Sequence, residues 1–139
     1  MRLSRLLAGR SVSALGFGGY RVSIGTAQHA EALTTSLDHG CNVIDTSPNY
    51  ADGGSEALIG SVLSSRASTE RPLVVTKVGT LQGAELQDAV AREQAGNPWR
   101  NVVKLSDAAW LCLSPEFIAH SVAASTRRLG APICGFNPG

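Results

Sequence analysis

The sequence predicts an α/β fold built on a parallel sheet. Short apolar runs alternate with helical patterns in the order strand, helix, strand, helix, strand. This order is typical of parallel strands joined by crossover helices. The runs Asn42–Asp45 and Leu73–Val78 are largely apolar until each reaches a charged residue near its end. Such runs indicate strands that are buried on both faces.

The first half of the chain supplies most of these elements. A strand is predicted at Val12–Phe17, with glycines at its exit. A helix begins near Thr26 and ends where Gly40 takes the position after the last turn. The second strand is followed by a polar loop, Thr46–Gly54. Ser55 is the predicted N-cap of the next helix.

A long stretch after the third strand breaks this rhythm. Residues Gly79–Leu113 are predicted as a loop insertion, much longer than the usual connection of about 2–6 residues. Part of it, Ala84–Ala95, has the pattern of an exposed helix, and Trp99 and Trp110 lie in the rest. An insertion at a strand's carboxyl end can form a lid or a wall of the pocket at that end. Alternatively, it has no functional role and its tryptophans only anchor it to the domain. Both interpretations stay open.

A strong helix pattern follows the insertion. Ser114 is the predicted N-cap, with Pro115 at the first helical position, and Gly130 ends the helix. Residues Ile133–Phe136 then predict the start of a fourth strand.

Length, charge and cysteine content exclude several classes of function and of partner. At 139 residues the chain is one domain or a piece of one. A net charge of +1 argues against nucleic acid or an anionic membrane as partner. No apolar run approaches the ~20 residues of a membrane span. The cysteines are widely separated and form no CxxC pair, so we expect no metal site, no disulfide and a cytoplasmic location.

Two predicted strands end in opposite charges. Asp45 ends the second run and Lys77 lies at the end of the third, while Tyr50 follows Asp45 by five residues. Neighbouring strands lie about 4.8 Å apart, within reach of a lysine side chain. We therefore expect the three side chains to meet at the carboxyl ends of the strands, where α/β folds carry their chemistry.

Such a group can move a proton. A tyrosine is a poor proton donor at neutral pH, but a neighbouring ammonium stabilises the phenolate, and a carboxylate keeps that ammonium charged and in place. The tyrosine then gives a proton to a carbonyl oxygen, or takes one from an alcohol, while another group moves a hydride. A purely structural salt bridge between strand ends is the alternative interpretation.

Several ordered blocks of the chain resemble the amino-terminal part of an aldo-keto reductase. They are Leu15–Tyr20, Asn42–Tyr50, Gly53–Gly60, Val75–Gly79 and Ser121–Gly130. The resemblance spans nearly all 139 residues and implies the amino-terminal portion of a (β/α)8 TIM barrel, incomplete and with about three to four strands. It also implies NADP- or NAD-dependent reduction of a small carbonyl compound, or oxidation of an alcohol or sugar.

The resemblance also assigns roles to individual residues. It implies that Asp45 and Lys77 form an ion pair and that Tyr50 is the general acid or base. It places the cofactor against the loop after the first strand and against the ion pair, at Gly18, Gly19, Tyr20 and Asp45.

One expected residue is missing. In the family a catalytic histidine ends the fourth strand, just before an Asn-Pro dipeptide. If Asn137-Pro138 is that dipeptide, Phe136 stands at the histidine position, and its side chain cannot donate a hydrogen bond. The chain's own histidines are predicted on helix surfaces, at His29, His39 and His120.

The rest of the barrel is missing as well, because a barrel of this kind takes about 250 residues. Three hypotheses therefore stay open. The chain is an oxidoreductase part with the Asp-Tyr-Lys group intact, an inactive half-barrel that pairs with another chain, or a truncated gene model of an ordinary reductase.

Overall fold

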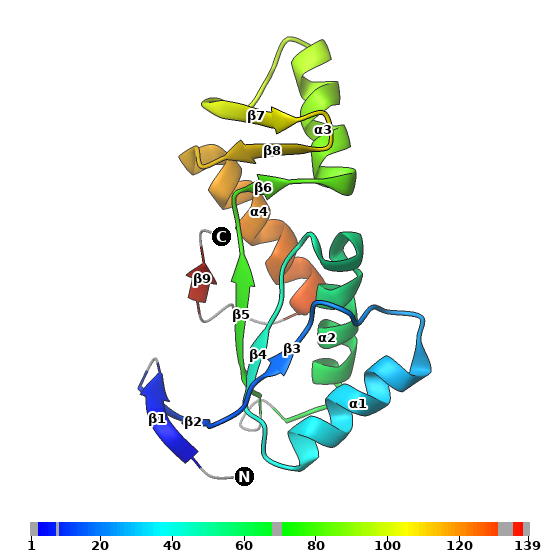
Figure 1. The fold of residues 1–139 in the computed structure, drawn as a ribbon, viewed down its shortest axis with the longest axis vertical. Coiled ribbons are helices and arrows are strands. Elements are labelled where there is room, and N and C mark those ends of the chain that lie inside the picture. The colour runs from blue at the N-terminus through cyan, green and yellow to red at the C-terminus, as the bar shows by residue number, and fades with distance from the viewer. Residues whose placement is uncertain (1–2, 8, 68–70, 131–134, 138–139) are drawn as a thin grey trace.

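A four-stranded sheet forms the centre of the molecule. The structure is a computed structural model that describes residues 3–7, 9–67, 71–130 and 135–137 (Figure 1). The sheet has the order β3-β4-β5-β9, and each neighbouring pair is parallel. Its strands are β3 (Phe17–Gly18), β4 (Val43–Asp45), β5 (Leu73–Lys77) and β9 (Gly135–Asn137). The predicted parallel sheet is thus confirmed.

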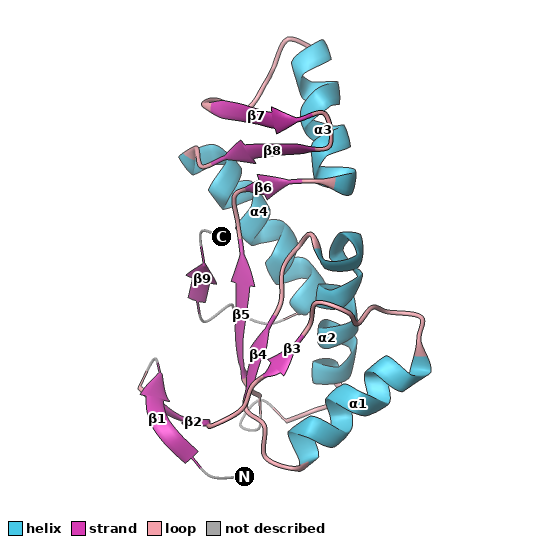
Figure 2. Ribbon diagram, viewed as in Figure 1, coloured by secondary structure: helices cyan, strands magenta, loops and turns pink. Residues whose placement is uncertain are grey.

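Helices cover one face of this sheet (Figure 2). They are α1 (Ala27–Asp38), α2 (Gly54–Ser64) and α4 (Pro115–Leu129). Their apolar side chains pack with alternate residues of β4 and β5 in one core, formed by Leu33, Leu37, Ile44, Ile59, Leu63, Val74 and Leu129. On the opposite face Val43 and Val75 are only half-buried. Leu73, on the same face of β5 as Val75, is buried, so the expectation of strands buried on both faces holds only in part for the described residues.

The predicted first strand divides into two. β2 (Arg10–Ser13) pairs antiparallel with β1 (Leu3–Leu7), whereas only β3 joins the parallel sheet. Side-chain hydrogen bonds explain the break. The backbone N–H of Ser13 donates to Asn42 Oδ1 (2.7 Å), and the Ser13 hydroxyl donates to the carbonyl of Leu15 (2.7 Å). These bonds turn the chain out of the β1–β2 ladder.

Most predicted helix ends are confirmed. Gly40, with φ of 88°, directly follows the C-cap of α1, and Gly130 ends α4 with φ of 60°. The Ser114 hydroxyl accepts a hydrogen bond from the backbone N–H three residues later, at 3.3 Å. The prediction for Ser55 is wrong, because α2 begins at Gly54 and its N-cap is the left-handed Gly53. The Ser55 hydroxyl bonds elsewhere in the buried interior.

The insertion is a folded unit and not a loop. It contains β6 (Thr80–Leu81), α3 (Gly83–Gln94), β7 (Val102–Ser106) and β8 (Ala109–Cys112). The strands form an antiparallel sheet in the order β6-β8-β7. Its core comprises Val78, Leu81, Leu86, Ala89, Trp110, Cys112 and Phe117. Figure 1 shows this unit beyond the carboxyl end of β5. The bounds of α3 were predicted within one residue. The prediction that this helix is exposed is wrong on one face, where Leu86 and Ala89 are buried.

Two further findings concern the environment of the chain. Within the described ranges, no helix combines the length and the apolar character needed to cross a bilayer. Cys41 and Cys112 are buried free thiols.

Candidate active site

Asp45 and Lys77 form an ion pair at the carboxyl ends of β4 and β5. The register places Asp45 opposite Val75, so Lys77 lies two residues further along its strand and its side chain reaches back. The Lys77 ammonium donates to Asp45 Oδ1 (2.9 Å), to Oδ2 (2.8 Å) and to the main-chain carbonyl of Thr46 (3.0 Å). The predicted proximity of the two charged strand ends is observed.

The surroundings keep Lys77 charged. Its side chain is 23% exposed, against 51% for Asp45. Partial burial by itself lowers the pKa of Lys77, but the hydrogen bond to Asp45 and the neighbouring Tyr50 outweigh it and raise the pKa above the ordinary 10.5. The ammonium therefore persists throughout the neutral range.

The raised pKa predicts how the ion pair responds to alkali. Its contribution to folding is complete below pH 10.5 and is lost as the pH rises through the higher folded-state value. We expect the Lys77 side-chain NMR signal to titrate above 10.5, and Asp45→Asn to lower that midpoint. The chain's other lysine, Lys104, reports unfolding in the same spectrum. A Lys77 midpoint that Asp45→Asn leaves unchanged contradicts the assigned cause.

Tyr50 lies beside this ion pair. It opens the short helix η1 (Tyr50–Gly53), and the Lys77 Nζ lies 4.9 Å from the centre of its ring. The Tyr20 ring packs against it edge-on, with centroids 5.0 Å apart. Ala51 and Asp52 follow with φ of 50° and 53°, a conformation that costs energy in residues with a side chain. The structure thus brings together the three predicted residues on a tightly shaped turn.

The glycine loop after β3 is tied to the same strand end. Gly19 donates its N–H to the Asp45 carbonyl (2.7 Å), and its own carbonyl accepts from the Ser55 hydroxyl (2.9 Å). Ser55 also shares a hydrogen bond with the Thr46 hydroxyl, at 2.9 Å. A Cβ on Gly19 would lie only 2.6 Å from Ser55 Oγ, whereas one on Gly18 would meet no atom within 4 Å. The close approach therefore requires glycine at position 19.

This difference between the glycines is testable. We expect Gly19→Ala to lower the free energy of unfolding by about 1–3 kcal/mol, because the new methyl group overpacks a buried contact. Gly18→Ala is the matched control and should stay within about 0.5 kcal/mol of the wild type. Urea unfolding followed by circular dichroism measures both. Equal losses in the two variants would show that the Ser55 contact does not restrict position 19.

Two cavities open beside the predicted catalytic residues. The larger, about 440 Å³, is lined by Tyr20, Arg21, Val22, Ser23, Asn49, Tyr50 and Ala51. The smaller, about 40 Å³, contacts Lys77 and Thr80 of the insertion. Asn49 lines both, and its Oδ1 is buried without a hydrogen-bond partner among the described residues. The sequence analysis did not predict Asn49 as a site residue. Its position directly before Tyr50 could have indicated that it lies at the site.

A second ion pair lies beneath the site. Glu56, on α2, is fully buried. Its Oε1 accepts a hydrogen bond from the Thr76 hydroxyl of β5 (2.6 Å), and its Oε2 accepts one from Arg128 Nε of α4 (2.7 Å). This network joins two helices to the strand that carries Lys77. Its charged side chains lie 72 residues apart in sequence, so sequence reasoning did not find it.

The fourth catalytic position is described only through the backbone. The register of β9 pairs Phe136 with Thr76 and Asn137 with Lys77. Asn137 is therefore the residue opposite the lysine, and the assignment of Phe136 to the histidine position stays a prediction. As expected, the histidines lie on helices or at a helix end: His29 on α1, His39 at its C-cap and His120 on α4.

The parallel sheet with helices on one face has the architecture of part of a (β/α)-barrel. The chain belongs to the aldo/keto reductase family, whose sequence model matches residues 14–132. It is 32% identical over 128 residues to the NADH-specific methylglyoxal reductase of Escherichia coli, covering 86% of this chain and 35% of that protein.

Solved structures agree with this assignment. The aldo-keto reductase AKR11C1 from Bacillus halodurans matches 88% of this chain with a TM-score of 0.65 and 24% identity, which supports the fold. An aldo-keto reductase from Klebsiella pneumoniae in complex with NADPH matches 87% with a TM-score of 0.54 and 26% identity. The chain covers 34% and 32% of those proteins, so it spans about a third of its relatives, and the described strands form no closed barrel.

Proposed function

We propose that the chain is the part of an NAD(P)(H)-dependent oxidoreductase that carries the proton-transfer group. The observation that supports this best is the Lys77 ammonium, bonded to both oxygens of Asp45 and 4.9 Å from the Tyr50 ring centre. The substrate class is a small carbonyl compound in reduction, or an alcohol or sugar in oxidation. The similarity to a methylglyoxal reductase supports a small carbonyl. The free, buried thiols accord with a cytoplasmic location.

Tyr50, Lys77 and Asp45 have different roles in the proposed reaction. A nicotinamide cofactor supplies the hydride that reduces the carbonyl carbon. The Tyr50 hydroxyl gives its proton to the carbonyl oxygen, so the product is an alcohol, and the phenolate regains a proton from water. Lys77 stabilises the phenolate by its charge, and Asp45 keeps the ammonium in position. Alcohol oxidation follows the same steps in reverse.

The residues proposed to hold the cofactor are Gly18, Gly19, Tyr20 and Asp45. The space around Gly18 supports this choice, since a bound group can approach its backbone without meeting another residue. Asn49 Oδ1, beside Tyr50, has no hydrogen-bond partner in the described part of the chain and can accept from an N–H donor. Relatives are described with NADH and with NADPH, and both cofactors are therefore candidates.

A second candidate function is an inactive half-barrel that pairs with another chain. The half-buried Val43 and Val75 on the uncovered sheet face favour it. So do the outer strands β3 and β9, since the edge of a sheet presents unpaired backbone groups.

Titration of the chain with NADPH, followed by nicotinamide fluorescence, distinguishes the two candidates. Saturable binding together with reduction of methylglyoxal supports the enzyme. Binding without turnover supports the half-barrel. Absence of both, in a chain whose circular dichroism shows it to be folded, contradicts cofactor binding by this polypeptide.

A further inference from the structure

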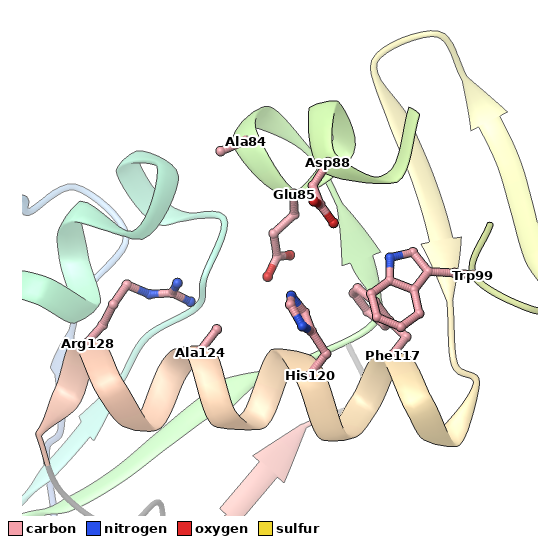
Figure 3. Close-up of a pocket in the computed structure, with 8 residues that line it drawn as sticks. All are labelled: Ala84, Glu85, Asp88, Trp99, Phe117, His120, Ala124 and Arg128. Carbon is pink, nitrogen blue, oxygen red and sulfur yellow. The ribbon is translucent and has the colours of Figure 1, made fainter. Parts of the chain in front are cut away.

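A separate cavity lies between the insertion and the barrel helices. It has a volume of about 170 Å³, and its walls come from α3, α4 and the segment that contains Trp99 (Figure 3). It shares no lining residue with the cavities beside Tyr50 and Lys77. Its size is close to that of an engineered protein cavity of about 150 Å³ that binds benzene. A ligand of a few non-hydrogen atoms therefore fits.

The α3 wall carries a carboxylate that forms no salt bridge within the described residues. Both oxygens of Glu85 are shielded from solvent, and the groups that stabilise its charge are Arg128 and the Ser121 hydroxyl, both on α4. Figure 3 shows this carboxylate extending from α3 into the space above α4, toward His120. Burying a charged group is costly, and the raised pKa of Glu85 shows that its neighbours offset only part of this cost. A cation that entered this space would relieve that cost.

The charge balance of the walls is acidic. Arg128 is the only lysine or arginine among the lining residues, and its Nε is already bonded to the buried Glu56 at 2.7 Å. Glu85 and Asp88, one helical turn apart on α3, take part in none of the salt bridges found among the described residues. Glu85 and the exposed Asp88 thus outnumber Arg128, the one lysine or arginine at the cavity, which favours a cationic ligand over an anionic one.

Aromatic side chains form the opposite end. The Trp99 ring lies edge-on to Phe117 with centroids 5.5 Å apart, and 5.2 Å from the His120 ring. Outside the cavity, the Arg92 guanidinium stacks on Trp99 with its central carbon 3.9 Å from the ring centre. The Trp99 indole therefore already forms a cation–π contact with one side chain. Aromatic rings combined with carboxylates are the surroundings that organic ammonium ions favour.

We propose that this cavity binds a small organic cation, a primary alkylammonium of about four carbons. Its ammonium group would meet Glu85 and Asp88, and its alkyl chain would lie against Trp99 and Phe117. A metal ion is the less suitable occupant, because the described residues contain no group of three His, Cys, Asp or Glu side chains able to hold one. The site is independent of the proposed proton transfer.

The experiment is an NMR titration of the folded chain with n-butylammonium. The chain has two tryptophans, so its indole N–H region should show two side-chain signals. We expect the Trp99 signal to shift in a saturable way, with a dissociation constant of about 1 mM, while the signal of Trp110, buried in the insertion core, stays in place. n-Butanol and butyrate have the same chain length with a neutral or a negative group, and we expect no saturation with either.

Variants make the test specific. Glu85→Gln retains the shape of the side chain and should weaken n-butylammonium binding about tenfold. Glu31→Gln, at an exposed position of α1, should leave it unchanged. Equal binding of n-butanol would show an apolar cavity only, and tighter binding of butyrate would show an anion site at Arg128. Either result, or no saturation by any probe, overturns the proposal.

The pH dependence provides a second readout. Burial raises the pKa of Glu85, as do the charges of Glu56 and Asp52, whereas Arg128 and the Ser121 hydroxyl oppose the shift. Below this raised pKa Glu85 is protonated, so n-butylammonium binding should strengthen as the pH rises through it. Asp88 and His120 also face the carboxylate. The pH dependence should disappear in Glu85→Gln, and its persistence there would assign it to one of those two residues and contradict the role of Glu85.

Discussion

Replacing Tyr50 with phenylalanine should reduce turnover by about 10²–10⁴-fold, the usual contribution of a positioned proton donor. The change removes only the hydroxyl and leaves a ring that still packs against Tyr20 and the Lys77 ammonium. The Asp45–Lys77 ion pair should stay intact, because Lys77 keeps its hydrogen bonds to both Asp45 oxygens and to the Thr46 carbonyl. The loss should therefore appear in kcat and not in stability.

The measurement is the rate of NAD(P)H consumption with an aldehyde, in whichever form of the protein turns over. Glu31→Gln is the control, because Glu31 lies at an exposed position of α1 and is not among the residues proposed to hold the cofactor or transfer the proton. Its rate should stay within about threefold of the wild type, a difference below about 0.7 kcal/mol. A wild-type rate in Tyr50→Phe would remove Tyr50 from its assigned role.

Replacing Glu56 with alanine should lower the free energy of unfolding by about 3–5 kcal/mol, the usual loss when one partner of a buried ion pair is removed. Glu56 has no exposed surface, and its two oxygens accept from Thr76 and Arg128. Its removal leaves the hydroxyl and the guanidinium without these partners between α2, β5 and α4. The damage should reach Lys77, which follows Thr76 on the same strand.

Urea unfolding measures this loss. Glu31→Ala, on the exposed side of α1, is the control and should change stability by no more than about 0.5 kcal/mol. Glu56→Gln separates charge from hydrogen bonding, since an amide oxygen can still accept from Thr76. A Glu56→Ala variant as stable as the control would mean that the ion pair only offsets the cost of its own burial.

Much of the candidate site was predictable, because it lies on elements with strong local signals. The runs that end in Asp45 and Lys77 are apolar strands, and parallel strands place their carboxyl ends together. The helix ends at Gly40, Ser114 and Gly130 were predictable for a similar reason. Capping depends on residues close in sequence, so the pattern is visible without the fold.

The errors arose where contacts distant in sequence decide the conformation. Ser55 has the residue type of an N-cap, but its hydroxyl bonds to Gly19, 36 positions earlier. The insertion looked like a loop because its strands are short and only one side of their sheet is buried. Neither the Glu56–Arg128 pair nor the cavity at Glu85 leaves a local pattern.

The sequence by itself determined the order of the parallel strands and of the helices between them, the family, and the residues Asp45, Tyr50 and Lys77, because periodicity and motif order are local properties. The tertiary structure decided that the lysine reaches back to the aspartate, that one sheet face is covered and that the insertion has its own core. These features depend on packing between segments many residues apart, and only the folded chain brings such segments into contact.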